Sequence, residues 1–195
     1  LDFKLNDDWS MKSVSAYRKS DTETNIDFDT LPNIIADVKA FYSDNQQSQE
    51  FQFNYDAGGQ LSGVAGLYWF QGEAGGTVLN NFFNAVFGNT NGQVDTDSIA
   101  FYGEGTWRFN DQWALTFGGR WTSEEKKFDI FNQSFSDATY TVATATVSDL
   151  NDSVKFTNFS PKVSIDYQAT EDTLIYGLAS RGFKSGGFNI RANIS

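Results

Sequence analysis

The sequence predicts an all-β fold, an antiparallel transmembrane β-barrel segment of about eight strands in four hairpins, with short turns at one end and long loops at the other. Three observations lead to this prediction. Apolar and polar residues alternate with a period of two along much of the chain, short and long connections alternate, and aromatic residues recur eight positions apart on one strand face.

The third hairpin shows the alternation most clearly. In residues 99–109 the odd positions are apolar or small, while the even positions include Glu104 and Arg108. After Asn110 and Asp111 the same alternation resumes, with Arg120 among the polar positions. Because Asn and Asp side chains bond their own backbone in turns, we expect a tight hairpin here. One face of this hairpin suits hydrocarbon and the other suits water.

The same unit recurs three more times. The other expected strand pairs are residues 1–5 and 9–19, residues 50–56 and 60–72, and residues 159–168 and 173–183. The connections between hairpins are expected to be long loops at residues 20–48, 73–97 and 125–153, and residues 80–87 could hold one short helical turn. Such loops are uncommon in compact domains, whereas outer-membrane barrels combine short periplasmic turns with long extracellular loops.

The aromatic spacing supports the same interpretation. Eight residues at ~3.3 Å per residue span about 26 Å, or about 20 Å along the membrane normal for a strand tilted by ~40°. This height is close to that of the apolar band between the two aromatic girdles of a membrane barrel. The aromatic pairs are Trp9 and Tyr17, Phe101 and Phe109, Trp113 and Trp121, and Phe159 and Tyr167.

Composition excludes several classes of protein. The 195 residues include 14 Lys and Arg against 25 Asp and Glu, giving a net charge of −11, with no Cys and no His. We therefore expect no disulfide framework, no thiolate or histidine metal site, no histidine-dependent catalysis and no nucleic-acid partner. The longest apolar run, residues 64–70, is too short for a membrane helix, and residues 1–5 do not resemble a signal peptide.

Two phosphate-binding patterns are incomplete. Residues 177–185 resemble a phosphate-binding loop, but Phe183 stands between Gly182 and Lys184. Residues 103–105 lack the third glycine of a dinucleotide-binding fingerprint. We expect no cofactor, and the protein is not expected to be an enzyme.

Residues 159–189 read FSPKVSIDYQATEDTLIYGLASRGFKSGGFN. The opening FSPK and the final RGFKSGGFN resemble the barrel of TonB-dependent outer-membrane receptors. Further similarity lies in residues 48–51, 64–70 and 117–122. Together these segments cover most of the chain outside the expected long loops.

The resemblance implies a 22-stranded barrel closed by an N-terminal plug, which imports ferric siderophores, cobalamin, haem or oligosaccharides with energy delivered by the TonB complex. This chain has about eight expected strands, and neither a plug nor a TonB box is recognised, so we expect residues 1–195 to be a partial barrel domain. The implied location is the bacterial cell outer membrane. The implied partners are outer-membrane lipid and lipopolysaccharide, the TonB complex through the missing plug, and a small-molecule nutrient ligand.

Ligand-binding candidates lie on the polar strand face and in the loops. Arg108, Arg120 and Arg181 are expected in the lumen, where they would attract anionic solutes or dock the plug, or else form ordinary salt bridges to Glu104, Glu124 or Asp166. Phe82 and Phe83, in the second long loop, would stack on a ligand or pack the loop onto itself. The acidic residues of the first long loop, which include Asp27, Asp29 and Asp37, are expected to be solvated, and no catalytic or metal site is expected.

Other kinds of protein stay open as alternatives. A free-standing eight-stranded barrel acting as an anchor or adhesin would need bulky interior residues, whereas the candidate interior positions are rich in Gly, Ala, Ser and Thr. An outer-membrane hydrolase would need a base in place of His, and a soluble β-sandwich would need a second sheet over the apolar face.

Overall fold

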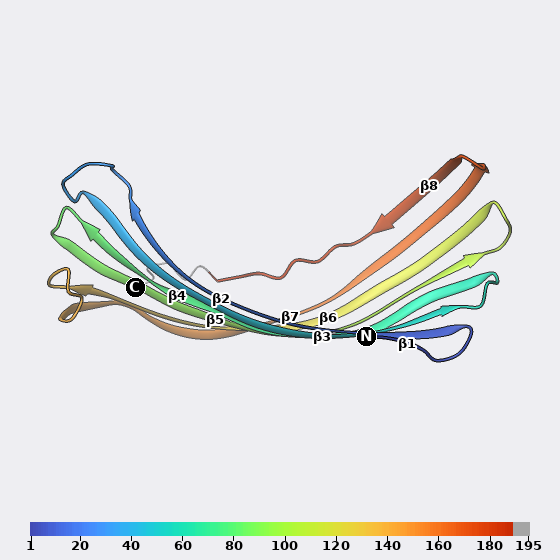
Figure 1. Cartoon of the computed structure of the whole chain (residues 1–195), viewed down its shortest axis with the longest axis horizontal. Coiled ribbons are helices and arrows are strands. Elements are labelled where there is room, and N and C mark those ends of the chain that lie inside the picture. Colours follow the sequence, from blue (N-terminus) through green and yellow to red (C-terminus); the bar gives the residue numbers. More distant parts are fainter. Residues whose placement is uncertain (189–195) are drawn as a thin grey trace.

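The computed structural model describes residues 1–188 and contains eight strands in one antiparallel sheet, with each strand beside its neighbour in the sequence (Figure 1). The strands are β1 (Asp2–Lys4), β2 (Trp9–Asp27), β3 (Ala36–Asp56), β4 (Leu61–Phe82), β5 (Val86–Arg108), β6 (Trp113–Phe135), β7 (Ala143–Thr170) and β8 (Thr173–Ser180). The predicted all-β antiparallel fold is confirmed.

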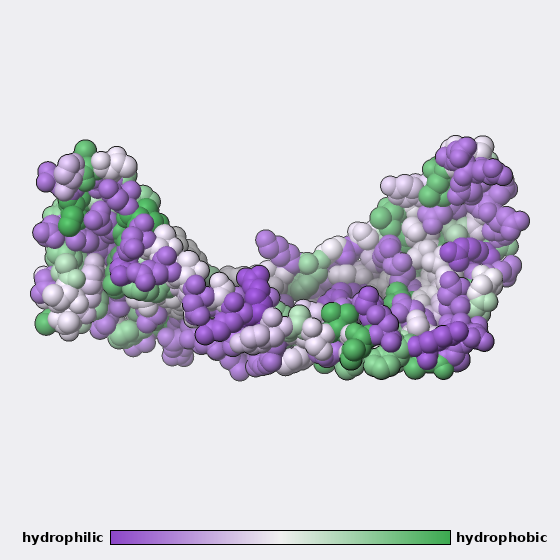
Figure 2. Space-filling model, in the orientation of Figure 1, coloured by the Kyte–Doolittle hydropathy of each residue, from purple (hydrophilic) through white to green (hydrophobic). Residues whose placement is uncertain are grey.

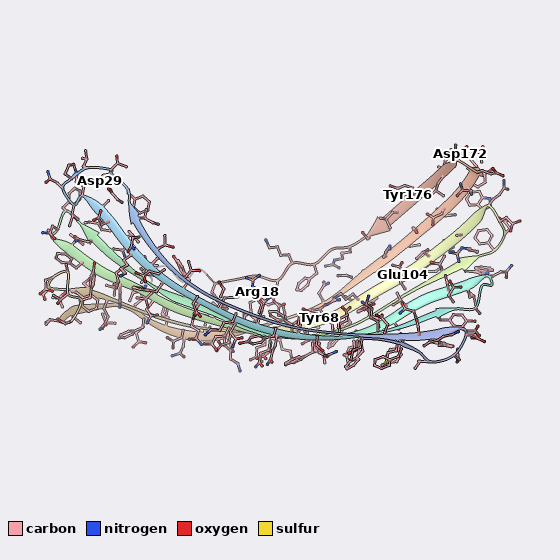
Figure 3. All side chains as sticks on the ribbon, viewed as in Figure 1. Arg18, Asp29, Tyr68, Glu104, Asp172 and Tyr176 are labelled. Carbon is pink, nitrogen blue, oxygen red and sulfur yellow. The ribbon has the colours of Figure 1, made fainter. Side chains whose placement is uncertain are left out.

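The sheet is a single curved layer whose connections gather at two opposite ends. Residues 5–8, 57–60, 109–112 and 171–172 form one end, which we call the turn end, and residues 28–35, 83–85 and 136–142 form the other, which we call the tip end. Asp172 and Asp29 mark these two ends in Figure 3. Within the described residues β1 and β8 lie at opposite edges of the sheet and do not pair, so the sheet is open.

The turn end forms by the predicted side-chain chemistry. Asn110 Oδ1 accepts hydrogen bonds from the backbone N–H groups of Gln112, at 2.9 Å, and Trp113, at 2.8 Å. Between β3 and β4 the chain turns at Gly58, whose φ of 68° is favourable for glycine. Each hairpin therefore reverses where its short polar or glycine-rich turn was predicted.

The long loops expected at residues 20–48, 73–97 and 125–153 are wrong as connections. Strands β2 to β7 continue through most of these segments, and the connections shrink to the three short segments of the tip end. The alternation of apolar and polar residues weakens there because the apolar face of the strands becomes mainly polar in these extensions. Loss of the apolar face marks where a strand leaves the hydrocarbon, while backbone pairing between neighbours continues beyond that level.

The short helical turn expected in residues 80–87 is also wrong. Strand β4 continues to Phe82 and β5 begins at Val86. Phe83 and Asn84 have φ values of 55° and 50°, in the left-handed region, which reverses the chain within a tight hairpin. In the described part of the chain, no helix is long and apolar enough to cross a membrane.

The sheet has little conventional core. Among residues 1–188 the buried apolar residues are Ala40, Phe87, Ala100 and Ile130. Large apolar side chains such as Phe117 and Phe159 are instead exposed, at 60% and 58%. All strands of the described residues belong to one sheet, so no second sheet covers this apolar face, as the β-sandwich alternative would require.

Candidate functional site: the two faces and the tip end of the wall

Cross-strand register separates the sheet into an apolar face and a polar face. Phe101 of β5 lies opposite Trp121 of β6, which lies opposite Phe159 of β7. One position along, Tyr102 lies opposite Arg120. Because successive side chains of a strand point to opposite faces, these two rows lie on opposite sides of the sheet. We call the face of Phe101 the outer face and the face of Arg120 the inner face.

Aromatic side chains of the outer face gather at two levels. Toward the tip end, the ring centroids of Phe101 and Trp121 lie 5.9 Å apart. Toward the turn end, Trp113 lies 4.5 Å from Tyr167 and 6.5 Å from Phe109. Figure 2 shows hydrophobic residues along the lower side of the half that carries the turn end. The aromatic residues predicted by their eight-residue spacing thus meet across neighbouring strands, as in the girdles of a membrane barrel.

The apolar band crosses the strands obliquely. Tyr17 of β2, a predicted girdle residue, lies in the same cross-strand row as Gln71 and Asp97. On β5 the girdle residue Phe101 stands four positions from Asp97, nearer the turn end. A band of constant height must cross tilted strands in this way, so the offset is the one expected of barrel strands.

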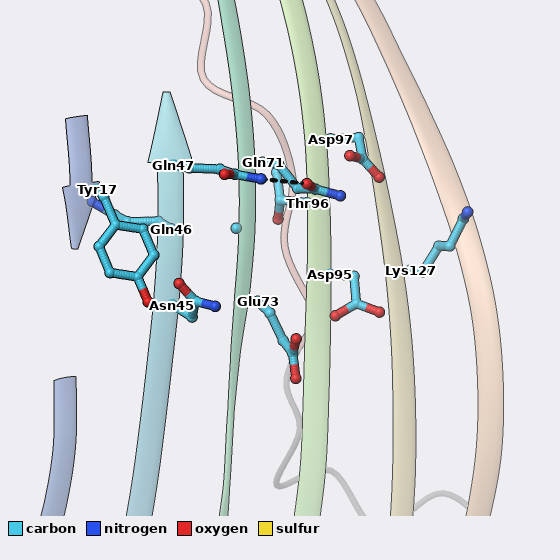
Figure 4. Close-up of a pocket in the computed structure, with 11 residues that line it drawn as sticks. Tyr17, Asn45, Gln46, Gln47, Gln71, Glu73, Asp95, Thr96, Asp97 and Lys127 are labelled. Atoms are coloured by element: carbon cyan, nitrogen blue, oxygen red, sulfur yellow. Dashed lines mark hydrogen bonds between the residues drawn. The ribbon is translucent and has the colours of Figure 1, made fainter. Parts of the chain in front are cut away.

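Just beyond the apolar band, the outer face carries a polar hollow of about 350 Å³ (Figure 4). Gln47 Nε2 donates a hydrogen bond to Gln71 Oε1 at 2.9 Å within it. Its other lining residues are Tyr17, Asn45, Gln46, Gly72, Glu73, Asp95, Thr96, Asp97 and Lys127. Amide, carboxylate and ammonium groups at this level can bind polar headgroups.

The centre of the inner face holds a cluster of aromatic and charged side chains around Arg120. Its guanidinium carbon lies 5.4 Å from the ring centroid of Tyr68 and 5.7 Å from that of Tyr102, within the range of cation–π attraction. The Tyr102 hydroxyl donates a 2.5 Å hydrogen bond to Glu50 Oε1. The Tyr102 ring lies over Gly66, where an added Cβ would come within 2.3 Å of the ring.

An ion pair crosses the inner face beside this cluster. Lys162 Nζ of β7 lies 2.7 Å from Glu104 Oε2 of β5, and Gly118 of β6 lies between them in the register. Both charged side chains are partly exposed, at 41% and 38%. A side chain on Gly118 would approach Glu104 Oε2 to 3.2 Å, so the glycine leaves room for this bridge across the strand.

The three predicted lumen arginines have different surroundings. Arg120 occupies the centre of the inner face. Arg108, near the turn end, donates a 3.3 Å hydrogen bond to Ser62 Oγ. Arg181 lies one residue beyond β8, so the shared strand face predicted for it together with Arg108 and Arg120 is wrong.

The arginine salt bridges to Glu104, Glu124 or Asp166 are wrong for the described residues. Two of these carboxylates have lysine partners instead: Glu104 pairs with Lys162, and Glu124 lies 3.3 Å from Lys126. The sequence contained the signal for the first pair, because Glu104 and Lys162 stand on the polar positions of their strands. It did not contain the register that brings the two strands to the same level.

The predicted loop aromatics lie at the tip end. Phe82 closes β4 and is 36% exposed, and Phe83 begins the following turn and is 70% exposed. Phe28 and Leu31, on the neighbouring tip, are also exposed, at 65% and 54%. These side chains give the tip end an apolar surface that could contact a ligand arriving from this side.

The third tip, residues 136–142, contacts neighbouring strands through Tyr140. The Tyr140 ring packs edge-on against Phe87 and Phe135, with centroid distances of 6.3 and 5.6 Å. Its hydroxyl donates a 3.0 Å hydrogen bond to the backbone oxygen of Asn80. Burial raises the pKa of the Tyr140 hydroxyl. A hollow of about 320 Å³ lies next to this contact, between the first and second tips.

Three carboxylates of the first tip come together. Oxygen atoms of Asp27, Asp29 and Asp37 lie within 4.8 Å of one another. Asp27 Oδ1 accepts bonds from the backbone N–H groups of Asp29 and Thr30, and Asp29 accepts from Leu31 and Ala36. These contacts show that the acidic residues shape the turn of the tip.

A curved antiparallel sheet with an apolar outer face, two aromatic levels and a polar inner face is the wall of a membrane-spanning barrel. The chain belongs to the TonB-dependent receptor family: the family described as "TonB dependent receptor-like, beta-barrel" matches residues 1–194. The predicted family is confirmed.

The chain is similar in fold to solved structures. One of them is the ferric yersiniabactin uptake receptor FyuA from Yersinia pestis, with a TM-score of 0.68 and 18% sequence identity over 88% of this chain. The match covers 25% of the FyuA chain, so this chain spans about a quarter of that receptor. The comparison with curated proteins finds no match.

Proposed function

We propose that this chain is part of the barrel wall of an outer-membrane receptor that takes up a scarce nutrient with energy from the TonB complex. The observation that carries the proposal is the match of the receptor barrel family to residues 1–194. The two-faced wall supports it, because an apolar outer face and a polar inner face fit a barrel with a water-filled lumen in a membrane.

Among the nutrients expected from the sequence, we favour a ferric siderophore over cobalamin, haem or an oligosaccharide. Support comes from the FyuA structure, whose described substrate is ferric yersiniabactin. The exposed Phe82 and Phe83 at the tip end would contact the ligand first. Arg108, Arg120 and Arg181 would then meet an anionic ligand or the plug domain along the lumen.

The remaining strands and the plug would be supplied by further parts of the same protein. The open sheet supports this proposal, because unpaired strand edges are not tolerated in a membrane. It argues against the free-standing eight-stranded anchor, which requires β1 and β8 to pair. The polar hollow lined by Tyr17, Gln47 and Gln71 would face the headgroups of outer-membrane lipid and lipopolysaccharide.

Uptake by the full-length protein tests this function. Cells that lack their own siderophore receptors would express the full-length protein and receive iron-55 bound to a panel of siderophores, with labelled cobalamin, haem and oligosaccharides in parallel. We expect accumulation of at least one ferric siderophore, lost when the TonB gene is deleted. Accumulation of another nutrient would overturn the siderophore assignment, and TonB-independent accumulation would overturn the transport mechanism.

A further inference from the structure

The chain leaves the sheet abruptly after β8. The last register pair joins Lys162 of β7 to Ser180 of β8, although the alternation predicted a strand up to Phe183. Residues 181–188 then cross the concave face of the sheet as an extended segment without assigned strand structure (Figure 1).

Pro161 gives a local reason for this departure. The Arg181 N–H donates a 3.0 Å hydrogen bond to the Pro161 carbonyl oxygen. In such an antiparallel pair the opposite residue would return a bond from its own N–H to the Arg181 carbonyl, but proline has no N–H. The pair therefore lacks one of its two hydrogen bonds at the position where β8 ends.

Side-chain direction gives a second reason. Lys162 and Ser180 are paired on the inner face, so a continued strand would place Arg181 on the outer face, beside Pro161 and close to Phe159. A charged side chain in a barrel's lipid-facing band is destabilising, and the cost grows toward the middle of the band. Both the backbone and the side chain at this level thus favour a chain that turns away from the β7 edge.

Lys126 of β6 anchors the departing segment to the inner face. Its Nζ donates hydrogen bonds to Ser185 Oγ at 3.0 Å and to the Gly186 carbonyl oxygen at 2.9 Å. Glu124, 3.3 Å away, balances the charge of this lysine, and both side chains are only 18% exposed. The ammonium group is therefore held in place by partners on the wall and on the segment.

Apolar contacts complete the attachment. The ring centroids of Phe128 and Phe188 lie 4.0 Å apart. The Phe156 ring lies so close to Gly186 that an added Cβ would meet it at 3.0 Å. Phe128 and Phe156 occupy inner-face positions, where a water-filled lumen predicts polar residues. The segment that covers them explains why aromatic residues stand there.

We propose that residues 181–188 form a strap, fixed to the inner wall by Lys126, Phe128 and Phe156, which lines and narrows the passage beside β6 and β7. The strap rests on the proposed function, since it requires a membrane barrel with a water-filled lumen. It carries Arg181 and Lys184, both exposed and, within residues 1–188, without a carboxylate partner. A ligand moving along this wall would meet the strap before it meets the strands behind it.

A cysteine scan of the full-length protein in outer-membrane vesicles tests the strap, and this chain has no cysteine of its own to interfere. Spin labels at positions 183, 184 and 187, one at a time, would report collisions with lipid-dissolved oxygen and with a water-soluble nickel complex. We expect every position to favour the nickel complex. A continued β8 would instead place position 183 on the outer face beside Phe159, so that 183 would favour oxygen and 184 the nickel complex. That difference would overturn the strap.

Control labels separate this result from the proposed function. Labels at Val163, on the outer face, and Ser164, on the inner face, are expected to favour oxygen and the nickel complex respectively. If the labels at Val163 and Ser164 showed the same preference between oxygen and the nickel complex, the membrane barrel itself would be contradicted. Correct control behaviour together with a preference for oxygen at position 183 would contradict the strap alone.

Two further variants test what holds the strap. Lys126→Met removes two charge-assisted hydrogen bonds, so we expect the ratio of detached to attached strap to rise about tenfold, seen as a more mobile label at Lys184. Lys127→Met is the matched control, because Lys127 points to the outer face. Equal label mobility in both variants would overturn the anchoring role of Lys126.

Pro161→Val restores the missing N–H. We expect it to extend β8, so that a label at position 183 gains collisions with oxygen. If the collision pattern matches that of the unaltered protein, Pro161 does not set the point at which the strap begins.

Discussion

Individual glycines allow large rings to lie flat on this wall. The Tyr102 ring covers Gly66 on the inner face, and the Phe159 ring covers Gly119 on the outer face, where an added Cβ would meet each ring at 2.3 and 2.8 Å. Rings placed over strand glycines shield the backbone that lacks a side chain. These residues were visible in the sequence as small and aromatic strand positions, but only the register matches each ring with its glycine.

Replacement of Gly66 tests this packing. We expect Gly66→Ala to displace Tyr102, to weaken its bond to Glu50, and to lower the free energy of unfolding by about 1–3 kcal/mol, as for overpacked sites generally. Unfolding of the full-length protein in urea, followed by tryptophan fluorescence in lipid vesicles, measures the change. Gly103→Ala is the control, because its Cβ would lie 3.6 Å from the Val64 carbonyl oxygen, an ordinary contact. Equal losses in both variants would contradict the specific role of Gly66.

The ion pair between Glu104 and Lys162 is expected to stabilise the wall only weakly. Both groups are partly exposed, and such pairs contribute about 0.2–1 kcal/mol. A double-mutant cycle with Glu104→Gln and Lys162→Met, read from urea unfolding, should give a coupling energy in this range that falls at high salt. A coupling energy well above that range would show that the lumen screens these charges less than water does.

At the scale of the strand, the two faces follow the sequence alternation closely. In β7, residues 153–165 alternate between exposed outer-face positions and half-buried inner-face positions. Val163 stands midway between the predicted girdle residues Phe159 and Tyr167 and is 37% exposed. A charged side chain should therefore lower the stability of the barrel much more at an outer-face position of this strand than at the adjacent inner-face position.

We expect Val163→Arg to destabilise the barrel by about 2–4 kcal/mol, because the guanidinium would enter the middle of the apolar band. Ser164→Arg, one residue along, should cost much less because its side chain points into the water-filled lumen. Reversible unfolding in lipid vesicles compares the two variants. A larger cost for Ser164→Arg would reverse the assignment of the two faces.

The contact of the third tip with its neighbours should depend on pH. Burial raises the pKa of Tyr140 above that of an unfolded tyrosine, so the stability from its hydrogen bond to Asn80 is complete below pH ~10 and is lost as pH rises through the higher folded-state value. Hydrogen exchange of residues 136–142 should therefore accelerate in alkaline solution. Tyr140→Phe, which keeps the ring, should lose about 1 kcal/mol of local stability and this pH dependence. Persistence of the pH dependence in Tyr140→Phe would assign it to another group.

At the scale of the whole molecule, the sheet has two unpaired edges. Strand β1 pairs only with Ser10, Met11 and Lys12 of β2, and β8 ends opposite Lys162, which leaves much of β2 and β7 without a partner on one side. Unpaired edges expose backbone hydrogen-bonding groups, which a membrane does not solvate. If the proposed function is correct, further strands join the sheet at these edges.

Amide hydrogen exchange tests this arrangement. In the full-length protein we expect the β2 amides beyond Lys12 to be as protected as those of β4, which has partners on both sides. In this chain alone, held in detergent, the same β2 amides should exchange faster than those of β4. Fast exchange of the β2 edge in both proteins would contradict the proposal that another strand pairs there.

The amino-acid pattern alone was enough to predict the strand class, the two faces, the turn end, the aromatic levels and the family. These features depend on local periodicity and on turn residues, so they can be recognised without knowing which strands meet. The sequence did not determine where the strands end near the tips, because backbone pairing continues after the apolar face is lost. The folded sheet was needed to show that Lys162 and Lys126, rather than arginines, pair with Glu104 and Glu124, and that the chain leaves the sheet at Arg181. These outcomes depend on register, which places residues distant in the sequence at the same level of the wall.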